Sequence, residues 1–338
     1  PMNEHGLERV SRRFLRFADT ECANGYAPHY DALSRSVAED EQLLEFLLAQ
    51  PSYQPNLLFA AVQYVTGPEL MPETALALRT VLADTRGQIP HLMRTKRTQT
   101  NEVGRAACLL PALPETPLAL LEVGASAGLV LNLDRYSYDY GTYQLHEGGK
   151  PLLACAIYGE PRLPVALPEI RWRRGLDLQP VDLTNPDNVA WLLACVWPDH
   201  PERRERLEQA IAIAQETPVG VQPGDLTRDV GAFLANAPPD ATMVVFHSAV
   251  LAYVERKKRR LLGEQLIRAS RERPIVWLSN EVPGIVPELE PLARPQPEFR
   301  FLLGRTTLYD GERTDELLAY THPHGNGMQW VGPRDNRD

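Results

Sequence analysis

A cluster of small residues follows one apolar run in the chain and has the composition of a ligand-binding turn. Residues 119–123 read Ala-Leu-Leu-Glu-Val, and residues 124–128 read Gly-Ala-Ser-Ala-Gly. The apolar run predicts a buried strand, and the apolar residues after Gly128 predict a helix. A turn without bulky side chains lets a ligand approach its backbone, and a helix that begins there offers free N–H groups. The pattern therefore predicts a strand, a tight turn and a helix around which a ligand site is built.

Polar residues stand at or beyond the carboxyl ends of five expected strands. The expected strands are the runs at residues 118–123, 169–173, 219–222, 242–246 and 274–278. The polar residues are Glu122, Asp177, Asp225, His247 and Glu281. Because parallel strands bring their carboxyl ends to one edge of a sheet, we expect these side chains to line a single cleft.

The strands alternate with helical segments, which predicts an α/β fold with a doubly wound, mostly parallel sheet. Two further strand-like runs, 299–309 and 317–320, flank Asp310-Gly311, a dipeptide typical of hairpin turns. They predict an antiparallel hairpin that extends the sheet, and a last strand is expected at 328–331. Residues 141–168 contain many Gly and Pro without a regular period, so we expect an irregular insertion there.

Residues 1–115 have apolar residues at helical spacing, beginning with Leu7, Val10, Phe14 and Phe17, and no alternating strand pattern. We expect an all-helical cap domain here, followed by the α/β domain at 116–338. A cap is attractive because an open α/β sheet leaves its ligand cleft exposed, and water must be kept out.

The polar segment 94–102 leads into an apolar helix expected at 103–110. Thr100 suits the N-cap of that helix and Glu102 suits its first turn, so a capped helix explains both residues. It does not explain Asn101 so easily. Asn101 is therefore a candidate ligand-binding residue of the cap.

The composition of the 338 residues argues against several classes of function. The net charge is −9, so a general electrostatic footprint for nucleic acid is absent, and the basic run 256–260 is typical of an exposed helix face. The four cysteines lack a CxxC pattern, which favours buried thiols in a reducing compartment over a disulfide framework or a metal site. No apolar run could span a bilayer, and residues 1–5 are not typical of a signal peptide. We expect a cytoplasmic protein whose partner is a small molecule, with no nucleic acid and no membrane.

The order of these motifs over residues 117–331 resembles the fold of S-adenosylmethionine-dependent methyltransferases. The resemblance implies that the turn at Gly124, Ser126 and Gly128 lies against the methionine and ribose of the cofactor. It implies that Asp177 takes the two ribose hydroxyls and that Asp225 meets the adenine amino group. A carboxylate only accepts hydrogen bonds, which suits paired hydroxyl donors. Ser126 stands where many members have glycine. The candidate cofactor-binding residues are Asn101, Glu122, Gly124, Ser126, Gly128, Asp177 and Asp225.

Five short runs give a second resemblance that covers nearly the whole chain. They are Gln99-Thr100-Asn101-Glu102, the turn at 124–128, Gly175-Leu176-Asp177-Leu178, Trp197-Pro198-Asp199 and Phe246-His247-Ser248-Ala249. These runs are similar to those of a bacterial family catalogued as a domain of unknown function, whose members are usually near this length. That family implies no activity of its own. It supports a cofactor only through its similarity to the methyltransferase fold.

Methyl transfer from a sulfonium depends on proximity, in-line geometry and exclusion of water, with a base where the acceptor arrives protonated. His247 and Glu281 are the candidate catalytic residues, because both end strands at the expected cleft. His247 would act as the base, and Glu281 would orient or deprotonate a substrate. A histidine that bonds a loop backbone and a carboxylate that caps a loop are the structural alternatives. His322 and His324 are too few for a metal site, so a surface turn is expected there.

Three other functions compete with the methyltransferase hypothesis. Residues 124–128 also read as G-x-S-x-G, the nucleophile elbow of a serine hydrolase, with Ser126 as nucleophile, His322 or His324 as base, and Glu281 or Asp310 as the acid. A hydrolase elbow follows several earlier strands of its sheet, however, and the N-terminal region of this chain shows none. A dinucleotide oxidoreductase needs G-x-G-x-x-G, which the chain lacks. A protein that binds S-adenosylmethionine or a related nucleoside without catalysis is the third alternative.

Overall fold

The computed structural model describes residues 2–286, 289 and 300–333, and the chain forms two compact units. Unit 1 contains residues 1–100 and 184–205, and unit 2 contains residues 101–183 and 206–338. Each unit has a hydrophobic core of its own. Unit 1 is thus built from two separate stretches of chain, an arrangement that the hydrophobic pattern did not indicate.

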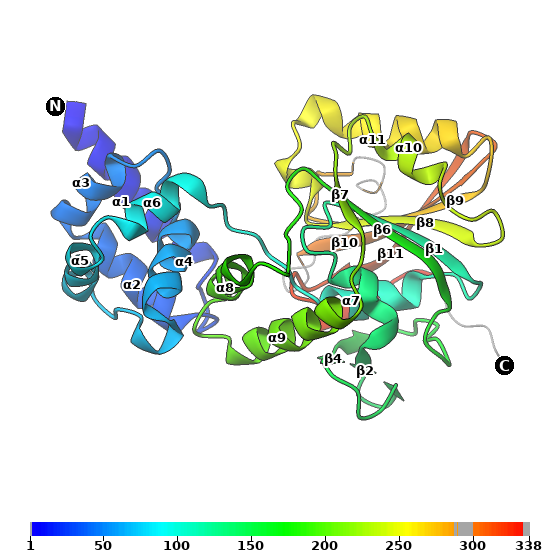
Figure 1. Ribbon diagram of the computed structural model, residues 1–338, viewed down its shortest axis with the longest axis horizontal. Helices are drawn as coiled ribbons and strands as arrows, with labels where there is room; N and C mark the ends of the chain where they lie inside the picture. Colours follow the sequence, from blue (N-terminus) through cyan, green and yellow to red (C-terminus); the bar gives the residue numbers. More distant parts are fainter. Residues whose placement is uncertain (1, 287–288, 290–299, 334–338) are drawn as a thin grey trace. The chain divides into compact units, whose positions relative to one another are not determined.

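Unit 1 is helical throughout its described residues (Figure 1). Its elements are α1 (Met2–Thr20), α2 (Pro28–Ala38), α3 (Glu41–Leu48), α4 (Pro55–Thr66), the 3-10 helix η1 (Pro68–Leu70), α5 (Ala75–Asp84), α6 (Gln88–Thr95), α8 (Pro186–Ala194) and the start of α9 (Pro201–Glu216). Local sequence explains where several of them begin. Asp40 accepts a hydrogen bond of 3.0 Å from the backbone N–H of Leu43 at the start of α3, and Pro28 and Pro55 occupy first turns.

Residues 184–205 belong to unit 1 because their side chains complete its core. Trp191 is buried in that core, and Trp197 packs against it. The carboxylate of Asp199 accepts a hydrogen bond of 2.8 Å from the backbone N–H of His29 in the first turn of α2. The buried amide of Gln63 donates to the Val196 carbonyl at 2.7 Å. The run Trp197-Pro198-Asp199 is thereby explained by packing and helix capping.

Unit 2 is built on a nine-stranded, mostly parallel sheet, which confirms the predicted α/β class. The strand order is β5-β12-β11-β10-β9-β8-β1-β6-β7. The five predicted strands are β1 (Leu118–Val123), β6 (Ile170–Asp177), β7 (Val221–Pro223), β8 (Thr242–Ser248) and β9 (Ile275–Glu281). They pair in parallel as β7-β6-β1-β8-β9. The chain therefore moves outward from β1 in one direction through β6 and β7, and in the other direction through β8 and β9.

An antiparallel hairpin extends the sheet beyond β9, as the sequence predicted. Its strands are β10 (Phe301–Tyr309) and β11 (Glu312–Thr321). Asp310 and Gly311 form the turn with φ values of 49° and 80°. Strand β12 (Gly327–Trp330) then pairs with β11. The expected start of this hairpin at residue 299 lies outside the described residues.

The expectation of an irregular insertion at 141–168 was wrong in part. Short strands β2 (Ser137–Asp139), β3 (Gln144–Leu145) and β4 (Leu152–Ala154) form a separate three-stranded sheet. Strand β5 (Ala156–Tyr158) pairs in parallel with β12 at the edge of the large sheet. Strands of two or three residues are too short to show an alternating pattern, which explains why the sequence did not reveal them.

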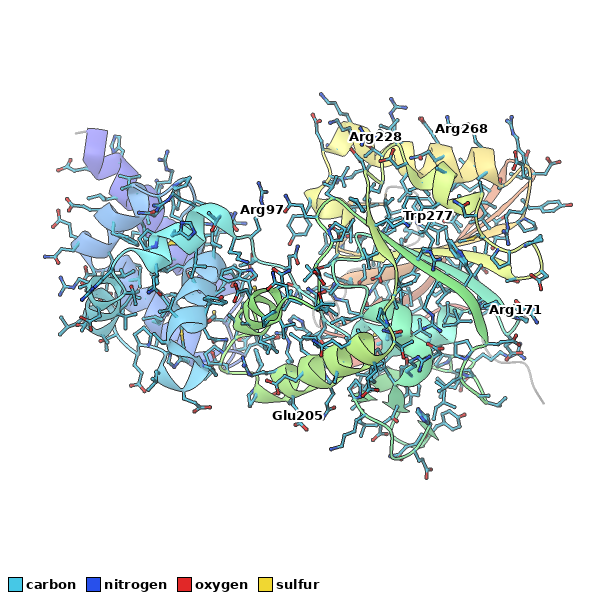
Figure 2. All side chains as sticks on the ribbon, in the orientation of Figure 1. Arg97, Arg171, Glu205, Arg228, Arg268 and Trp277 are labelled. Carbon is cyan, nitrogen blue, oxygen red and sulfur yellow. The ribbon has the colours of Figure 1, made fainter. Side chains whose placement is uncertain are left out.

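Helices cover both faces of the large sheet (Figure 1). Helices α10 (Val230–Leu234) and α11 (Arg256–Ala269) lie over one face (Figure 1). Leu262 and Leu266 of α11 join the core with Leu121 and Trp277, and Figure 2 labels Trp277. The short helix α7 (Arg105–Leu109), followed by the 3-10 helix η2 (Leu110–Ala112), lies on the opposite face. None of the described helices is long and apolar enough to cross a membrane.

Candidate functional site

The sheet of unit 2 has its topological switch point between β1 and β8. The two strands pair in parallel, with Glu122 in register with Phe246. The chain leaves β1 toward β6, whereas β8 leads toward β9. In open α/β sheets ligands bind at the carboxyl ends of the strands beside such a point, because the connecting loops diverge there. The turn at 124–128 and the loop at 249–251 both lie at this edge.

The turn after β1 has a special backbone conformation. Gly124, Ser126 and Gly128 have φ values of 72°, 52° and 70°. A methyl group on Gly124 would lie 2.5 Å from the Val250 side chain, and one on Gly128 would lie 2.7 Å from that of Val221. The two glycines are therefore required by backbone conformation and by internal packing.

Every backbone N–H of the turn has a partner within the protein. The N–H groups of Gly124 and Ala125 donate to the Leu176 carbonyl, and that of Gly128 donates to the Ala125 carbonyl. The N–H of Ser126 donates to Asp177, and that of Ala127 to Asn101. The helix predicted after the turn is only a kinked 3-10 helix, η3 (Val130–Arg135). The expectation of free helical N–H groups was wrong, and the turn is not a phosphate cradle.

Asp177 lies at the end of β6 and holds the turn in place. One carboxylate oxygen accepts the Ser126 N–H at 2.8 Å, and the other accepts the Gln179 N–H at 2.8 Å. The side chain is partly exposed at this edge. A carboxylate has about four acceptor positions, so each oxygen keeps capacity for a further donor.

Asn101 lies beside the same turn. Its Oδ1 accepts a long hydrogen bond of 3.4 Å from the Ala127 N–H, and its buried Nδ2 has no hydrogen-bond partner. The prediction of Thr100 as a helix N-cap was wrong, because α7 begins at Arg105 without a side-chain cap. Glu102 is buried instead, and it accepts the Gly104 N–H at 3.1 Å.

Glu122 is a buried carboxyl group at the penultimate residue of β1. Burial, and then the neighbouring Asp177 carboxylate, raise its pKa well above the usual value, and Arg105 opposes this shift. Its Oε2 has no hydrogen-bond partner. A ligand that brings a hydrogen-bond donor or a positive charge to this atom would satisfy it.

His247 and Glu281 form a buried pair on the two neighbouring strands. The His247 Nδ1 lies 2.7 Å from Glu281 Oε1, and the two side chains are 0% and 2% exposed. The same oxygen accepts the backbone N–H groups of Val250 at 2.9 Å and Leu251 at 3.0 Å. Burial raises the pKa of Glu281, but the hydrogen bonds from His247, Leu251 and Val250 outweigh it, so the pKa is lowered. The pair fixes the loop that packs on Gly124.

Glu122 and the His247–Glu281 pair lie on opposite faces of the sheet. Glu122 is in register with Phe246, and side chains in register share a face while successive residues alternate. His247 therefore points to the other face, where its ring lies 6.0 Å from that of Trp277. The two groups reach the same edge of the sheet, but the structure does not bring them into one cluster.

Asp225 follows β7, at the far side of β6 from β1. Its Oδ1 accepts hydrogen bonds from the Thr227 hydroxyl at 2.7 Å and the Thr227 N–H at 2.8 Å. These bonds lower the pKa of Asp225. Asp225 is partly exposed at the same edge as Asp177. The carboxylates that follow β6 and β7 thus stand on adjacent strands.

Arg105 is a central residue of this region that the sequence analysis did not identify. Its guanidinium is buried and donates to the carbonyls of Pro323 at 2.8 Å and Ser248 at 3.2 Å. It also lies 5.6 Å from the ring centre of Phe301. The only signal in the sequence is a single arginine inside an apolar helical stretch. Its partners are too distant along the chain for a local pattern to reveal them.

The residues proposed for a hydrolase are not assembled. Glu281 bonds His247, whereas His324 lies 3.5 Å from Glu102. Asp310 follows β10 at the opposite end of β9 from Glu281, because Leu302 pairs with Glu281 and Leu308 pairs with Ile275. These two pairs are about 20 Å apart along the strand. Among the described residues, no group of three or more His, Cys, Asp or Glu side chains could hold a metal ion.

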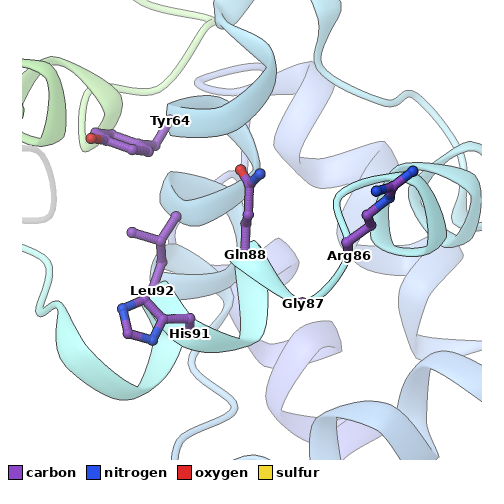
Figure 3. A pocket seen from close by; sticks show the side chains of 6 residues that line it. All are labelled: Tyr64, Arg86, Gly87, Gln88, His91 and Leu92. Atoms are coloured by element: carbon purple, nitrogen blue, oxygen red, sulfur yellow. The ribbon is translucent and has the colours of Figure 1, made fainter.

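Unit 1 has a shallow pocket of its own, with a volume of about 350 Å³ (Figure 3). Tyr64, Leu92 and His91 line one side of it, and the Arg86-Gly87 turn and Gln88 complete the lining. None of the predicted site residues lies in this pocket. Arg86, Gln88 and His91 are exposed, so the pocket lacks the buried polar groups of a specific site.

The chain belongs to a family described as uncharacterised proteins conserved in bacteria, DUF2332, whose family model matches residues 11–330. The predicted membership of a bacterial family of unknown function is thereby confirmed. A search of curated proteins finds no match to the chain. Function must therefore be argued from the site itself.

Proposed function

We propose that this protein is an S-adenosylmethionine-dependent methyltransferase that acts on a small molecule. The observation that carries the proposal is the position of Asp177 at the carboxyl end of β6, beside the turn that follows β1. Its carboxylate bonds the Ser126 N–H of the adjacent turn and is partly exposed at the carboxyl edge of the sheet. A vicinal diol is the natural partner of such an acceptor-only group, and the ribose of a nucleoside cofactor supplies one.

The other residues of this edge suit the remaining parts of the cofactor. In the proposed complex, Gly124, Ser126 and Gly128 lie along the methionine and ribose, and Asp225 accepts from the adenine amino group. The buried Nδ2 of Asn101 and Oε2 of Glu122 lack partners. In the proposed complex, the carboxylate of the α-amino acid group accepts a hydrogen bond from Asn101 Nδ2, and its ammonium donates one to Glu122 Oε2. The hydrogen-bond donors and acceptors at this edge of the sheet therefore suit S-adenosylmethionine.

The cofactor, when bound, supplies an electrophilic methyl group. The protein has to hold the acceptor in line with it and to keep water away. Glu281 and His247 contribute by fixing residues 249–251, and Val250 of that loop lies against Gly124. We assign this positioning role to the pair. A role for His247 as the base stays a prediction, since its side chain is 0% exposed.

Calorimetry with S-adenosylmethionine and S-adenosylhomocysteine tests the proposal directly. We expect both to bind, and we expect methyl transfer from the first to at least one acceptor in a metabolite panel. If neither nucleoside binds, the proposal is overturned. Binding of both without transfer to any acceptor would support the non-catalytic alternative.

A serine hydrolase is the second candidate, favoured by the positive φ of Ser126 in a G-x-S-x-G turn. The acid and the base of that hypothesis have other partners, because Glu281 bonds His247 and His324 lies 3.5 Å from Glu102. We therefore expect a fluorophosphonate probe to leave Ser126 unlabelled. Labelling that is lost in Ser126→Ala would support the hydrolase instead.

A further inference from the structure

Two buried cysteines of unit 2 lie next to each other. The sulfur atoms of Cys108 and Cys155 are 3.9 Å apart, and the residues are 0% and 1% exposed. Cys108 belongs to α7, and Cys155 is the single residue between β4 and β5. They are distant along the chain, so the pattern of cysteines in the sequence does not predict the contact.

The contact joins three parts of unit 2. The Cys108 sulfur also lies 3.7 Å from the Gly325 carbonyl and 3.8 Å from the Gly327 carbonyl. The backbone around Cys155 is fixed by two hydrogen bonds. The N–H of Cys155 donates to the Asp139 carbonyl, and the N–H of Ala156 donates to the Asn326 carbonyl. The two thiols are therefore held as neighbours by ordered backbone on both sides.

We propose that Cys108 and Cys155 are a redox pair that forms an intrachain disulfide when the protein meets a peroxide. A disulfide needs a sulfur separation of about 2.05 Å, so the two side chains have to approach by roughly 2 Å. Such a shift is within the reach of side-chain rotation and small backbone movement. The bond would tie α7, which carries Arg105, to the link between the two sheets.

The chemistry needs hydrogen peroxide as the oxidant and no other reactant. The hydrogen bond with Cys155, followed by burial, raises the pKa of Cys108, so Cys108 keeps its proton. The Cys155 sulfur attacks peroxide, the O–O bond breaks, and the thiol proton leaves with the displaced oxygen, so that a sulfenic acid and one water form. The Cys108 sulfur then attacks the sulfenic sulfur, the S–O bond breaks, and the thiol proton leaves with the oxygen as water. Two thiols are oxidised, and one peroxide is reduced to two waters.

The remaining cysteines provide matched controls. Cys22 and Cys195 belong to unit 1, and no contact between their sulfurs is found in the described structure. Burial, and then Asp31, raise the pKa of Cys22 to about 12. Burial raises the pKa of Cys195 to about 11. The raised pKa values keep both of these thiols protonated near neutral pH.

The test treats the full-length protein with graded hydrogen peroxide, followed by denaturing alkylation and peptide mass spectrometry. We expect a cross-linked peptide that joins Cys108 to Cys155, two fewer alkylated cysteines, and a rise in Tm of roughly 5 °C or more because a long loop is closed. The reducing agent dithiothreitol should reverse all three. The same cross-link and the same rise are expected in Cys22→Ala and Cys195→Ala.

The variants Cys108→Ala and Cys155→Ala should show no rise in Tm and no cross-link. Two variants are used because alanine at the helix position could impair folding, whereas Cys155 lies in a short connection. Oxidation of wild type to sulfinic acid without a cross-link would overturn the proposal, as would a cross-link that involves Cys22 or Cys195. The result does not depend on cofactor binding, so it stands or falls separately from the proposed methyltransferase function.

Discussion

The carboxylate of Asp177 and the backbone N–H of Ser126 are joined by a hydrogen bond of 2.8 Å. This bond ties the end of β6 to the turn after β1, and the second oxygen of Asp177 accepts the Gln179 N–H. Asp177 therefore has a structural role in addition to the ligand-binding role that we propose. Predictions for this residue have to separate the two.

The variant Asp177→Ala should weaken binding of S-adenosylmethionine by at least about tenfold, because it removes the proposed acceptor of a ribose diol. It should also lower the free energy of unfolding by about 1–3 kcal/mol, since two backbone N–H groups lose a charged partner. Calorimetry gives the first quantity and urea unfolding gives the second. Asp315→Ala is the control, because Asp315 bonds Thr306 and Arg313 on the hairpin. Equal loss of affinity in both variants would contradict a binding role for Asp177.

Strands β1, β8 and β9 could be predicted because parallel strands buried on both faces are continuous apolar runs. All six residues of β1 are buried, and the five predicted strands occur in the predicted sequence order. The hairpin was predictable from Asp310-Gly311, since both residues need a positive φ. These features follow from local sequence. The parts that depend on contacts between distant residues did not.

The short helix after the turn illustrates this limit. The apolar residues 129–133 suggested an ordinary α-helix, but the Tyr136 and Tyr138 hydroxyls bond the carbonyls of Leu129 and Leu133. The Leu129 carbonyl also accepts the backbone N–H of Asn132, which is the i to i+3 pattern of a 3-10 helix. The hydrogen bonds of Arg105 to Ser248 and Pro323 are a second case, because more than a hundred residues separate the partners. The residue types at the site were predictable, whereas the pairs that they form were not.

The close packing of Gly124 against Val250 predicts a large cost for a single methyl group. Gly124→Ala should lower the free energy of unfolding by about 2–4 kcal/mol, from the positive φ and the overlap with Val250 together. Gly141→Ala isolates the first contribution, because Gly141 has a φ of 84° and open space around it. Its expected cost is about 1–2 kcal/mol. Denaturant unfolding measures both variants.

The double variant Gly124→Ala, Val250→Ala tests the steric part. Removing the two Val250 methyl carbons that lie 2.5 Å from the added group should make it less destabilised than the sum of the two single variants. Strict additivity would mean that the backbone conformation alone requires glycine. In that event, Val250 would not be the contact that holds the loop against the turn.

Glu122 should make wild type less stable as the pH rises. Its pKa in the folded state is raised above the unfolded value of about 4.3, so above that pH the unfolded state loses a proton that the folded state retains. The free energy of unfolding therefore falls from pH 4.3 upward until the folded group also ionises. Glu122→Gln removes this loss, so the variant should gain stability relative to wild type between pH 5 and neutrality. Urea unfolding at several pH values measures the difference, and a difference that does not vary with pH would contradict the raised pKa.

Glu281 should show the opposite sign. Its pKa is lowered in the folded state, so it contributes stability that is present above the unfolded pKa of about 4.3 and is lost as the pH falls through the folded value. Glu281→Gln should therefore cost about 2–3 kcal/mol at pH 7, where the carboxylate bonds His247, Val250 and Leu251. This cost should shrink below pH 4.

Glu264→Gln serves as the matched control for Glu281→Gln, because Glu264 pairs with Arg260 on the exposed side of α11. Exposed pairs of this kind contribute little, so its cost should stay below about 1 kcal/mol at every pH. The positioning role of Glu281 adds a second readout. If the carboxylate fixes the loop at 249–251, then Glu281→Gln should speed amide hydrogen exchange at Val250 and Leu251, and Glu264→Gln should not. Unchanged exchange at both amides would mean that another contact holds the loop. The pair of His247 and Glu281 would then be assigned to catalysis instead of positioning.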